Sequence, residues 1–225
     1  ARSRAARAKR AASSTPARRI NALVRTIAKD HDAKRQRILD VAASVFAREG
    51  IARASMNEVA RACGISKANI YHYYASKDDL LFDILDCYLS VLRYRICGLD
   101  LTGRSPPDCL RLICQEFLLA YEGMDHEHKI QTEGLPLLQP DKQEVLRGYQ
   151  RDLVGRVSTI LTDCAPKALA QDKALRRELT MSVFGMLNWF YMWKPRADRA
   201  SRLSYGDRVA TLMLEGLRGF EGDDA

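Results

Sequence analysis

The side chains best suited to chemistry lie in a segment of twenty residues, Ser55 to Tyr74. Ile70 and Tyr74 are four residues apart, which places both on the buried face of a short helix. The other faces then carry a lysine, a small residue, an amide, a phenol and an imidazole. Lysine and tyrosine can reach phosphates, and the Asn69 amide can address a base edge, with adenine as its preferred partner. The pattern predicts contact with nucleic acid through Lys67, Ala68, Asn69, Tyr71, His72 and Tyr73.

Lys77 is a second candidate for phosphate contact. It stands at the first position of an expected helix, where the macrodipole favours an anion and disfavours a cation. A lysine at that place is explained if a phosphate docks at the helix start. The alternative is a lysine side chain that merely extends into water.

The elements that must position these residues form a helix-turn-helix. A helix is expected from Asp32 to Glu49, with Gly50 as its stop, and a second from the N-cap Ser55 to Cys63. Gly64 and Ile65 make the turn, Ser66 caps the next helix, and Ser76 with Asp79 forms a capping box for a fourth. The expected inward residues are Ile38, Leu39, Ala42, Val45, Phe46, Val59, Ala60, Cys63, Ile70, Tyr74, Leu80, Leu81, Ile84 and Leu85.

Ile38–Phe46 followed by Ser-x-x-x-Val-Ala-x-x-Cys-Gly-Ile-Ser-Lys-Ala-Asn-Ile-Tyr-His-Tyr-Tyr-x-Ser-Lys-x-x-Leu (55–80) resembles the DNA-binding domain of the TetR family of bacterial repressors. The resemblance implies a homodimer that binds a palindromic operator, places its third helices in successive major grooves and is released by a small-molecule inducer. Tyr74 stands where the family usually has phenylalanine, and Ala68 where glycine is common. The family's DNA-binding residues map onto Ser55, Met56, Asn57, Lys67, Ala68, Asn69, Tyr71, His72, Tyr73 and, as a phosphate clamp, Lys77.

The rest of the chain also has helical periodicity, which predicts an all-α fold. Helices are expected at about 107–124, 126–134, 137–164, 173–193 and 204–220. We expect a basic N-terminal arm (1–30), a helix-turn-helix domain (31–80) and a helical effector-binding and dimerisation domain (81–225). The family resemblance implies dimerisation through the last two helices.

The segment from Asn188 to Pro195, together with Leu203-Ser204 and 212–217, is similar to a TetR subgroup that controls fatty-acid, sterol or aromatic-acid degradation. That resemblance implies an acyl-coenzyme A thioester as inducer. A TetR-type repressor that senses a non-CoA hydrophobic or aromatic ligand is the alternative.

The stretch Met181–Trp193 is apolar nearly all round, so a single helix there should be buried on every side. One side could form a dimer seam and another an aromatic pocket, with arginines meeting coenzyme phosphates at its mouth. Plain core packing of the apolar residues and a solvated face for the arginines are the alternatives. The candidate ligand-binding residues are Arg111, Phe117, Tyr121, Arg147, Arg151, Phe184, Asn188, Trp189, Met192 and Trp193, with Arg156 as a further arginine.

The net charge of +8 is concentrated at the N-terminus. Residues 1–30 hold nine basic side chains and one acidic one, whereas residues 31–225 hold 27 of each. Such an arm is typical of contact with polyanions such as nucleic acid, although a transit peptide or a solvated tail has a similar composition. The apolar residues of Arg18–Lys29 are spaced as in a short amphipathic helix that could pack on the body.

Other classes of site find little support. The six cysteines are scattered and predict reduced thiols in a bacterial cytoplasmic protein, without a zinc site. His126 and His128 point about 200° apart on a helix and are better explained by a surface loop or helix start capped by Asp125 than by a metal site. No catalytic motif, cofactor loop or membrane span is expected, so an acyl-CoA-processing enzyme or a helical adaptor remains a weaker alternative.

Overall fold

The computed structural model describes residues 16–221, with side chains described for residues 31–220. It is all-α over this range, which confirms the predicted fold class. The helices are α2 (Pro16–Glu49), α3 (Met56–Cys63), α4 (Lys67–Tyr73), α5 (Lys77–Cys97), α6 (Pro106–Ala120), α7 (Asp125–Gly134), the 3₁₀ turn η1 (Leu135–Leu137), α8 (Pro140–Cys164), α9 (Pro166–Leu169), α10 (Lys173–Asn188), α11 (Phe190–Trp193) and α12 (Arg199–Glu221).

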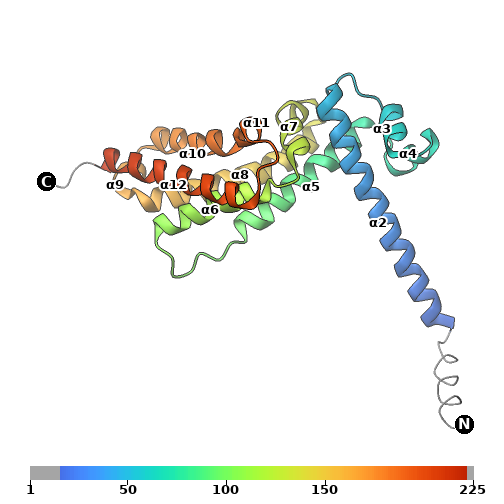
Figure 1. Cartoon of the computed structure of the whole chain (residues 1–225), viewed down its shortest axis with the longest axis horizontal. Coiled ribbons are helices and arrows are strands. Elements are labelled where there is room, and N and C mark those ends of the chain that lie inside the picture. Colours follow the sequence, from blue (N-terminus) through green and yellow to red (C-terminus); the bar gives the residue numbers. More distant parts are fainter. Residues whose placement is uncertain (1–15, 222–225) are drawn as a thin grey trace, which may run out of the picture.

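A small head at one end of the molecule consists of α2, α3, α4 and the start of α5 (Figure 1). Helices α3, α4 and α5 begin where the sequence predicted, because the N-cap serine of each accepts a hydrogen bond from the backbone three residues on. The Ser55 and Ser66 hydroxyls accept from the amides of Glu58 and Asn69, and the Ser76 hydroxyl accepts from the amide of Asp79. All fourteen residues expected to face inward are buried.

Gly64 makes the turn between α3 and α4 possible. Its φ of +70° lies in the left-handed region, which favours glycine. The amide of Ile65 returns to the carbonyl of Ala60 at 3.0 Å, and this bond closes the end of α3. The turn therefore fixes the direction in which α4 leaves the head.

The body is an elongated bundle in which α6, α8, α10 and α12 run roughly along the long axis (Figure 1). The crossing of α6 and α12 is close, because a Cβ on Gly206 would lie 2.8 Å from the backbone nitrogen and Cα of Gln115. Beside it, Arg202 is buried, and its guanidinium donates to the carbonyls of Ala197 and Leu118. These carbonyls compensate the buried charge.

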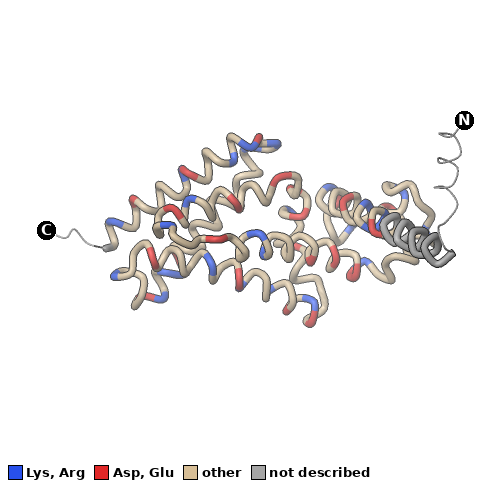
Figure 2. The backbone as a smooth tube through the Cα atoms, turned by 90° about the horizontal axis from the view of Figure 1, so that it is seen from below, with Lys and Arg blue, Asp and Glu red and all other residues tan. Residues whose placement is uncertain are grey.

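Helix α5 belongs to both parts of the molecule. Its first turn carries Leu80 and Leu81 in the core of the head, and Leu89 and Leu92 lie farther along it in the body. Acidic and basic residues are interspersed along the body and not gathered in blocks (Figure 2). None of the helices described by the structure is both long enough and apolar enough to cross a bilayer.

Three features differ from the sequence-based prediction. Helix α2 is continuous from Pro16 to Glu49, where two helices were expected, since neither glycine nor proline interrupts it. The expected helix 173–193 breaks at Trp189 into α10 and α11. The expected start of α8 shifts to Pro140, because Leu135–Leu137 form a 3₁₀ turn. The predicted basic arm lies outside the described residues over 1–15, as do the side chains of 16–30.

Candidate nucleic-acid interface and ligand cavity

Helix α4 presents an exposed polar face at the end of the molecule. Lys67, Ala68, Asn69, Tyr71 and His72 are all exposed, as the helical spacing predicted. The Lys67 ammonium lies 6.0 Å from the centre of the Tyr71 ring, so the cation and the phenol occupy one side of the helix. This face carries side chains of the kinds that contact phosphates and base edges in DNA.

Tyr73 is half-buried and connects α4 to α2. Its ring stacks on His31, with centroids 5.0 Å apart. A hollow of about 410 Å³ beside it is lined by Lys34 and Arg37 of α2 and by Asn69 of α4. The sequence-based prediction missed these α2 residues, although they are basic and stand one turn or less before the first buried residue of the helix.

Two predicted DNA contacts need correction. Met56 is only 6% exposed and belongs to the core of the head, because it follows the cap Ser55 on the inward side of α3. The Lys77 ammonium donates to three backbone carbonyls, those of Ile51 (2.8 Å), Ala52 (3.2 Å) and Ala54 (3.0 Å).

Lys77 therefore anchors the loop between α2 and α3, and its three donors are not directed at a phosphate. Ser55 and Asn57, the neighbours of Met56, are exposed as expected. The carboxylate of Glu58 accepts from the Ser55 amide at 2.7 Å, and this hydrogen bond lowers the pKa of Glu58.

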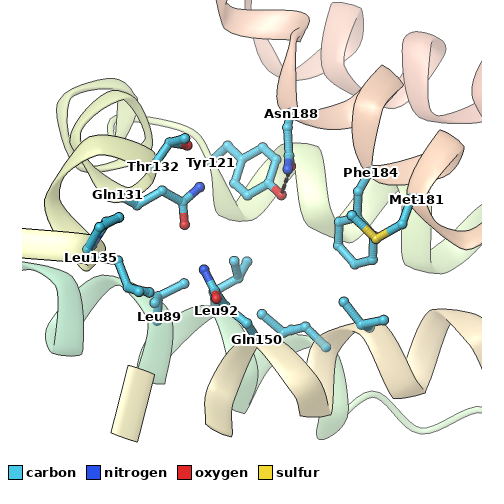
Figure 3. A pocket seen from close by; sticks show the side chains of 13 residues that line it. Leu89, Leu92, Tyr121, Gln131, Thr132, Leu135, Gln150, Met181, Phe184 and Asn188 are labelled. Carbon is cyan, nitrogen blue, oxygen red and sulfur yellow. Dashed lines mark hydrogen bonds between the residues drawn. The ribbon is translucent and has the colours of Figure 1, made fainter. Parts of the chain in front are cut away.

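The body contains a cavity of about 370 Å³ between α5, α7, α8 and α10 (Figure 3). Three of the ten predicted ligand-binding residues line it: Tyr121, Phe184 and Asn188. Among the described residues, no charged side chain contributes to its lining. The sequence-based prediction missed the other lining residues, Leu89, Leu92, Gln131, Thr132, Leu135, Pro136, Gln150, Leu153, Val154 and Met181.

Five predicted residues lie away from this cavity. Phe117 is fully buried behind Phe184, with ring centroids 5.4 Å apart, and Arg111 donates to the Thr211 hydroxyl on α12. The prediction of one continuous helix over Met181–Trp193 is wrong. The helix breaks at Trp189, and exposed fractions of 49 to 61% are found for Met181, Trp189, Met192 and Trp193.

Arg147 and Arg151 lie beside the cavity and not in it. With Arg177 they border a shallow groove of about 460 Å³, which shares Gln150, Val154 and Met181 with the cavity. Arg151 pairs with Glu144 at 2.6 Å. Arg156 donates to the carbonyl of Leu99 and does not line this groove.

A buried polar network supports the wall of the cavity. The nitrogen Nε2 of His128 lies 2.9 Å from the carbonyl of Asn188, and its Nδ1 lies 2.7 Å from the Tyr88 hydroxyl. A carbonyl can only accept, so Nε2 carries the hydrogen and Nδ1 accepts from Tyr88. Burial lowers the pKa of His128 and raises the pKa of Tyr88, which favours the neutral forms that this pattern needs. The expectation that both histidines lie on the surface is therefore wrong for His128, while His126 is exposed.

Two helices of the cavity wall, α7 and α8, contact the head directly. Lys129 of α7 donates to the carbonyl of Ala47 at 2.7 Å, close to the end of α2. Lys142 of α8 contacts Asp78 (2.6 Å) and Asp79 (2.5 Å) at the start of α5. The lysine's hydrogen bond lowers the pKa of Asp79. Helix α7 thus contributes both to the cavity wall and to the surface that holds the head.

Comparison with known proteins identifies relatives of both parts. Residues 38–84 match the family described as "Bacterial regulatory proteins, tetR family", and residues 103–217 match "Tetracyclin repressor-like, C-terminal domain". A TetR-family transcriptional regulator from Bordetella parapertussis 12822 is 31% identical, with a TM-score of 0.75, over 80% of this chain and 94% of that chain.

Two further relatives are more distant. AibR, solved in complex with isovaleryl coenzyme A and operator DNA, is 22% identical, with a TM-score of 0.65, over 84% of this chain and 98% of its own, and it shows the same fold. The HTH-type transcriptional repressor KstR2 of Mycobacterium tuberculosis H37Rv is 26% identical over 97 residues, which are 43% of this chain and 47% of KstR2. The chain spans about half the length, or less, of the curated relatives it matches.

Proposed function

The chain belongs to the TetR family of bacterial regulatory proteins, and on that basis we propose that it is a repressor released from a palindromic operator by a small molecule. Members of this family are DNA-binding transcriptional regulators and not enzymes. The operator would place the protein in the bacterial cytoplasm. The observation that carries the proposal is the exposed polar face of α4, held by a capped and fully packed head.

Three exposed residues of α4 have defined roles in this proposal. Asn69 reads a base edge, whereas Lys67 and Tyr71 contact phosphates, with Ser55, Asn57, Ala68, His72 and Tyr73 at the same interface. Lys34 and Arg37 flank the groove beside Tyr73 and add phosphate contacts. The basic arm of residues 1–30 supplies attraction that does not depend on sequence.

Operator binding tests these roles. Purified protein should bind its own promoter region with an affinity that falls steeply as salt rises. Removal of residues 1–30 should weaken binding to every duplex alike and reduce the salt dependence. A salt-independent affinity, or an arm deletion that changes only operator discrimination, would contradict the proposal.

We propose that two copies associate through α10 and α12, the last two long helices. Both helices carry exposed apolar side chains, Met181 on α10 and Leu212 and Phe220 on α12, and Trp189 is exposed directly after α10. Such a seam would place the two α4 helices against successive major grooves, about 34–36 Å apart on B-DNA. Light scattering should report a dimer, and Leu212→Glu should shift it to a monomer, while the exposed Val91→Glu on α5 should not.

We propose an acyl-coenzyme A thioester as the inducer. The acyl part would enter the uncharged cavity, and the coenzyme phosphates would contact Arg147, Arg151 and Arg177 in the adjoining groove. A non-CoA hydrophobic ligand is the second candidate, because Arg151 already pairs with Glu144 and no charged side chain described by the structure lines the cavity itself.

Native mass spectrometry of the purified protein separates the two inducers by the mass of any small molecule that copurifies. An acyl-CoA inducer should release the operator, and Arg147→Ala with Arg177→Ala should weaken that release. Arg104→Ala, which changes an exposed arginine in the loop before α6, is the control. Equal release by the double variant would favour the second candidate.

A further inference from the structure

One amide in the cavity is held more firmly than the others. Three primary amides line it: Asn188 on α10, Gln131 on α7 and Gln150 on α8 (Figure 3). Asn188 is fixed through both its backbone and its side chain. Its carbonyl accepts from His128 Nε2 at 2.9 Å, and its Oδ1 accepts from the Tyr121 hydroxyl at 2.7 Å.

These bonds determine which end of the Asn188 amide faces the cavity. The Tyr121 hydroxyl is buried, and Asn188 Oδ1 is its one partner among the described residues, so its hydrogen is satisfied only if Tyr121 donates. Burial raises the pKa of Tyr121, which keeps that hydrogen in place. The NH₂ group of Asn188 is therefore left as a donor, and no described residue accepts from it.

A ligand that covers this donor removes it from water and must therefore supply an acceptor in place of the water. Figure 3 shows the Asn188 side chain directed into the cavity between Tyr121 and Phe184. The lining described by the structure offers no cation, and the arginines of the adjoining groove lie outside it, so an ionised carboxylate buried beside Asn188 would lose its hydration without compensation. A neutral carbonyl loses little hydration free energy when it enters the cavity, and it can accept a hydrogen bond from the NH₂ group of Asn188.

We infer that Asn188 selects ligands whose buried part carries a neutral carbonyl, as in a thioester, ester or ketone, and that it disfavours an ionised carboxylate at the same place. Tyr121 and His128 act as positioning residues for Asn188. This inference rests on the proposed ligand-sensing function and narrows the class of inducer. Gln131 and Gln150 lack comparable anchoring in the part of the chain described, so fixing their amides costs more conformational entropy.

The test uses three probes with the same eight-carbon chain. S-octanoyl-N-acetylcysteamine is a neutral thioester, S-octyl-N-acetylcysteamine keeps the same acetamide but lacks the thioester carbonyl, and octanoate is charged. Calorimetry on the full chain should give an affinity for the thioester about tenfold above that for the thioether, since an unmade buried hydrogen bond costs about that factor. Octanoate should bind more weakly than either.

Substitutions then show whether Asn188 causes the difference in affinity between the thioester and the thioether. Asn188→Leu should remove the tenfold difference, and the nearly isosteric Asn188→Asp should do the same at pH 8, where the new carboxylate offers no donor. Gln131→Leu and Gln150→Leu are matched controls and should keep the difference. Tyr121→Phe should reduce it, because the amide is then free to rotate.

Three results would overturn the inference: retention of the difference in both Asn188 variants, octanoate binding as tight as thioester binding, or no thioester binding by the wild type. Unchanged operator binding in any of these cases would leave the proposed DNA-binding function intact. The two proposals therefore fail separately.

Discussion

Replacing Lys77 by methionine distinguishes an anchor of the α2–α3 loop from a phosphate clamp. Methionine keeps most of the aliphatic length and removes the ammonium that donates to the carbonyls of Ile51, Ala52 and Ala54. If Lys77 anchors the loop, its replacement should lower the stability of the protein. If Lys77 is a phosphate clamp, its replacement should lower the affinity for DNA and leave the stability unchanged.

The expected loss of stability follows from the three bonds. Those to Ile51 and Ala54 are partly buried, whereas the bond to Ala52 is exposed and contributes little. Hydrogen bonds to charged groups contribute about 1.5 kcal/mol each and somewhat less where solvent reaches them, so loss of the two partly buried bonds should lower the free energy of unfolding by about 2 to 3 kcal/mol. In a chain of this length that corresponds to a decrease in Tm of roughly 5 to 10 °C.

Thermal unfolding and operator titrations at several salt concentrations measure the two effects separately. Lys77→Met should lower Tm and leave the salt dependence of binding unchanged. Lys67→Met is the matched control, because Lys67 is exposed on α4. It should change the free energy of unfolding by no more than about 0.5 kcal/mol. It should also reduce the slope of log affinity against log salt by about one.

The opposite result for Lys77, an unchanged Tm with a slope reduced by one, would refute the anchor. It would restore the phosphate clamp that the position at the start of α5 suggested from the sequence.

Three further predictions concern the operator, the bundle and the pH dependence. Asn69→Ala should cost about 1–3 kcal/mol of discrimination at particular base pairs, seen as a relaxed preference when single operator positions are varied. Gly206→Ala should lower the free energy of unfolding in urea by about 1–3 kcal/mol, because its Cβ would meet the backbone of α6 at 2.8 Å. Gly155→Ala, with nothing within 4 Å of the new Cβ, should be neutral or stabilising. Burial lowers the folded-state pKa of His128, so below about pH 6.5 the unfolded chain binds a proton that the folded chain does not. The free-energy advantage of the wild type over His128→Gln in unfolding should therefore shrink as pH falls below 6.5, and an advantage that grows on acidification would contradict the assigned neutral ring.

The head could be predicted from the sequence because its determinants are local. Caps such as Ser66 act on the backbone three residues on, and the spacing of Ile70 and Tyr74 fixes which side of α4 is buried. The contacts of Lys77 could not be predicted, since its acceptors lie 23 to 26 residues away along the chain.

The cavity was harder to predict, because it depends on how four helices pack. Tyr121, Phe184 and Asn188 line the cavity, and they had been selected because they belong to the apolar, aromatic stretch 181–193 or could pack against it. Trp189 has the same character but follows the break after α10 and points away. Composition alone does not show on which side of such a break a side chain emerges.

Helix α5 extends without a break from the head to the cavity wall, and this continuity matters for regulation. Leu81, in the core of the head, and Leu92, in the cavity wall, are eleven residues apart on one unbroken helix, or about 17 Å. A rod of that length transmits tilt and translation without shortening, so a molecule that pushes on one end cannot leave the other end at rest. The head therefore needs no separate signalling linker, because a ligand in the cavity would contact the same helix that carries part of the head.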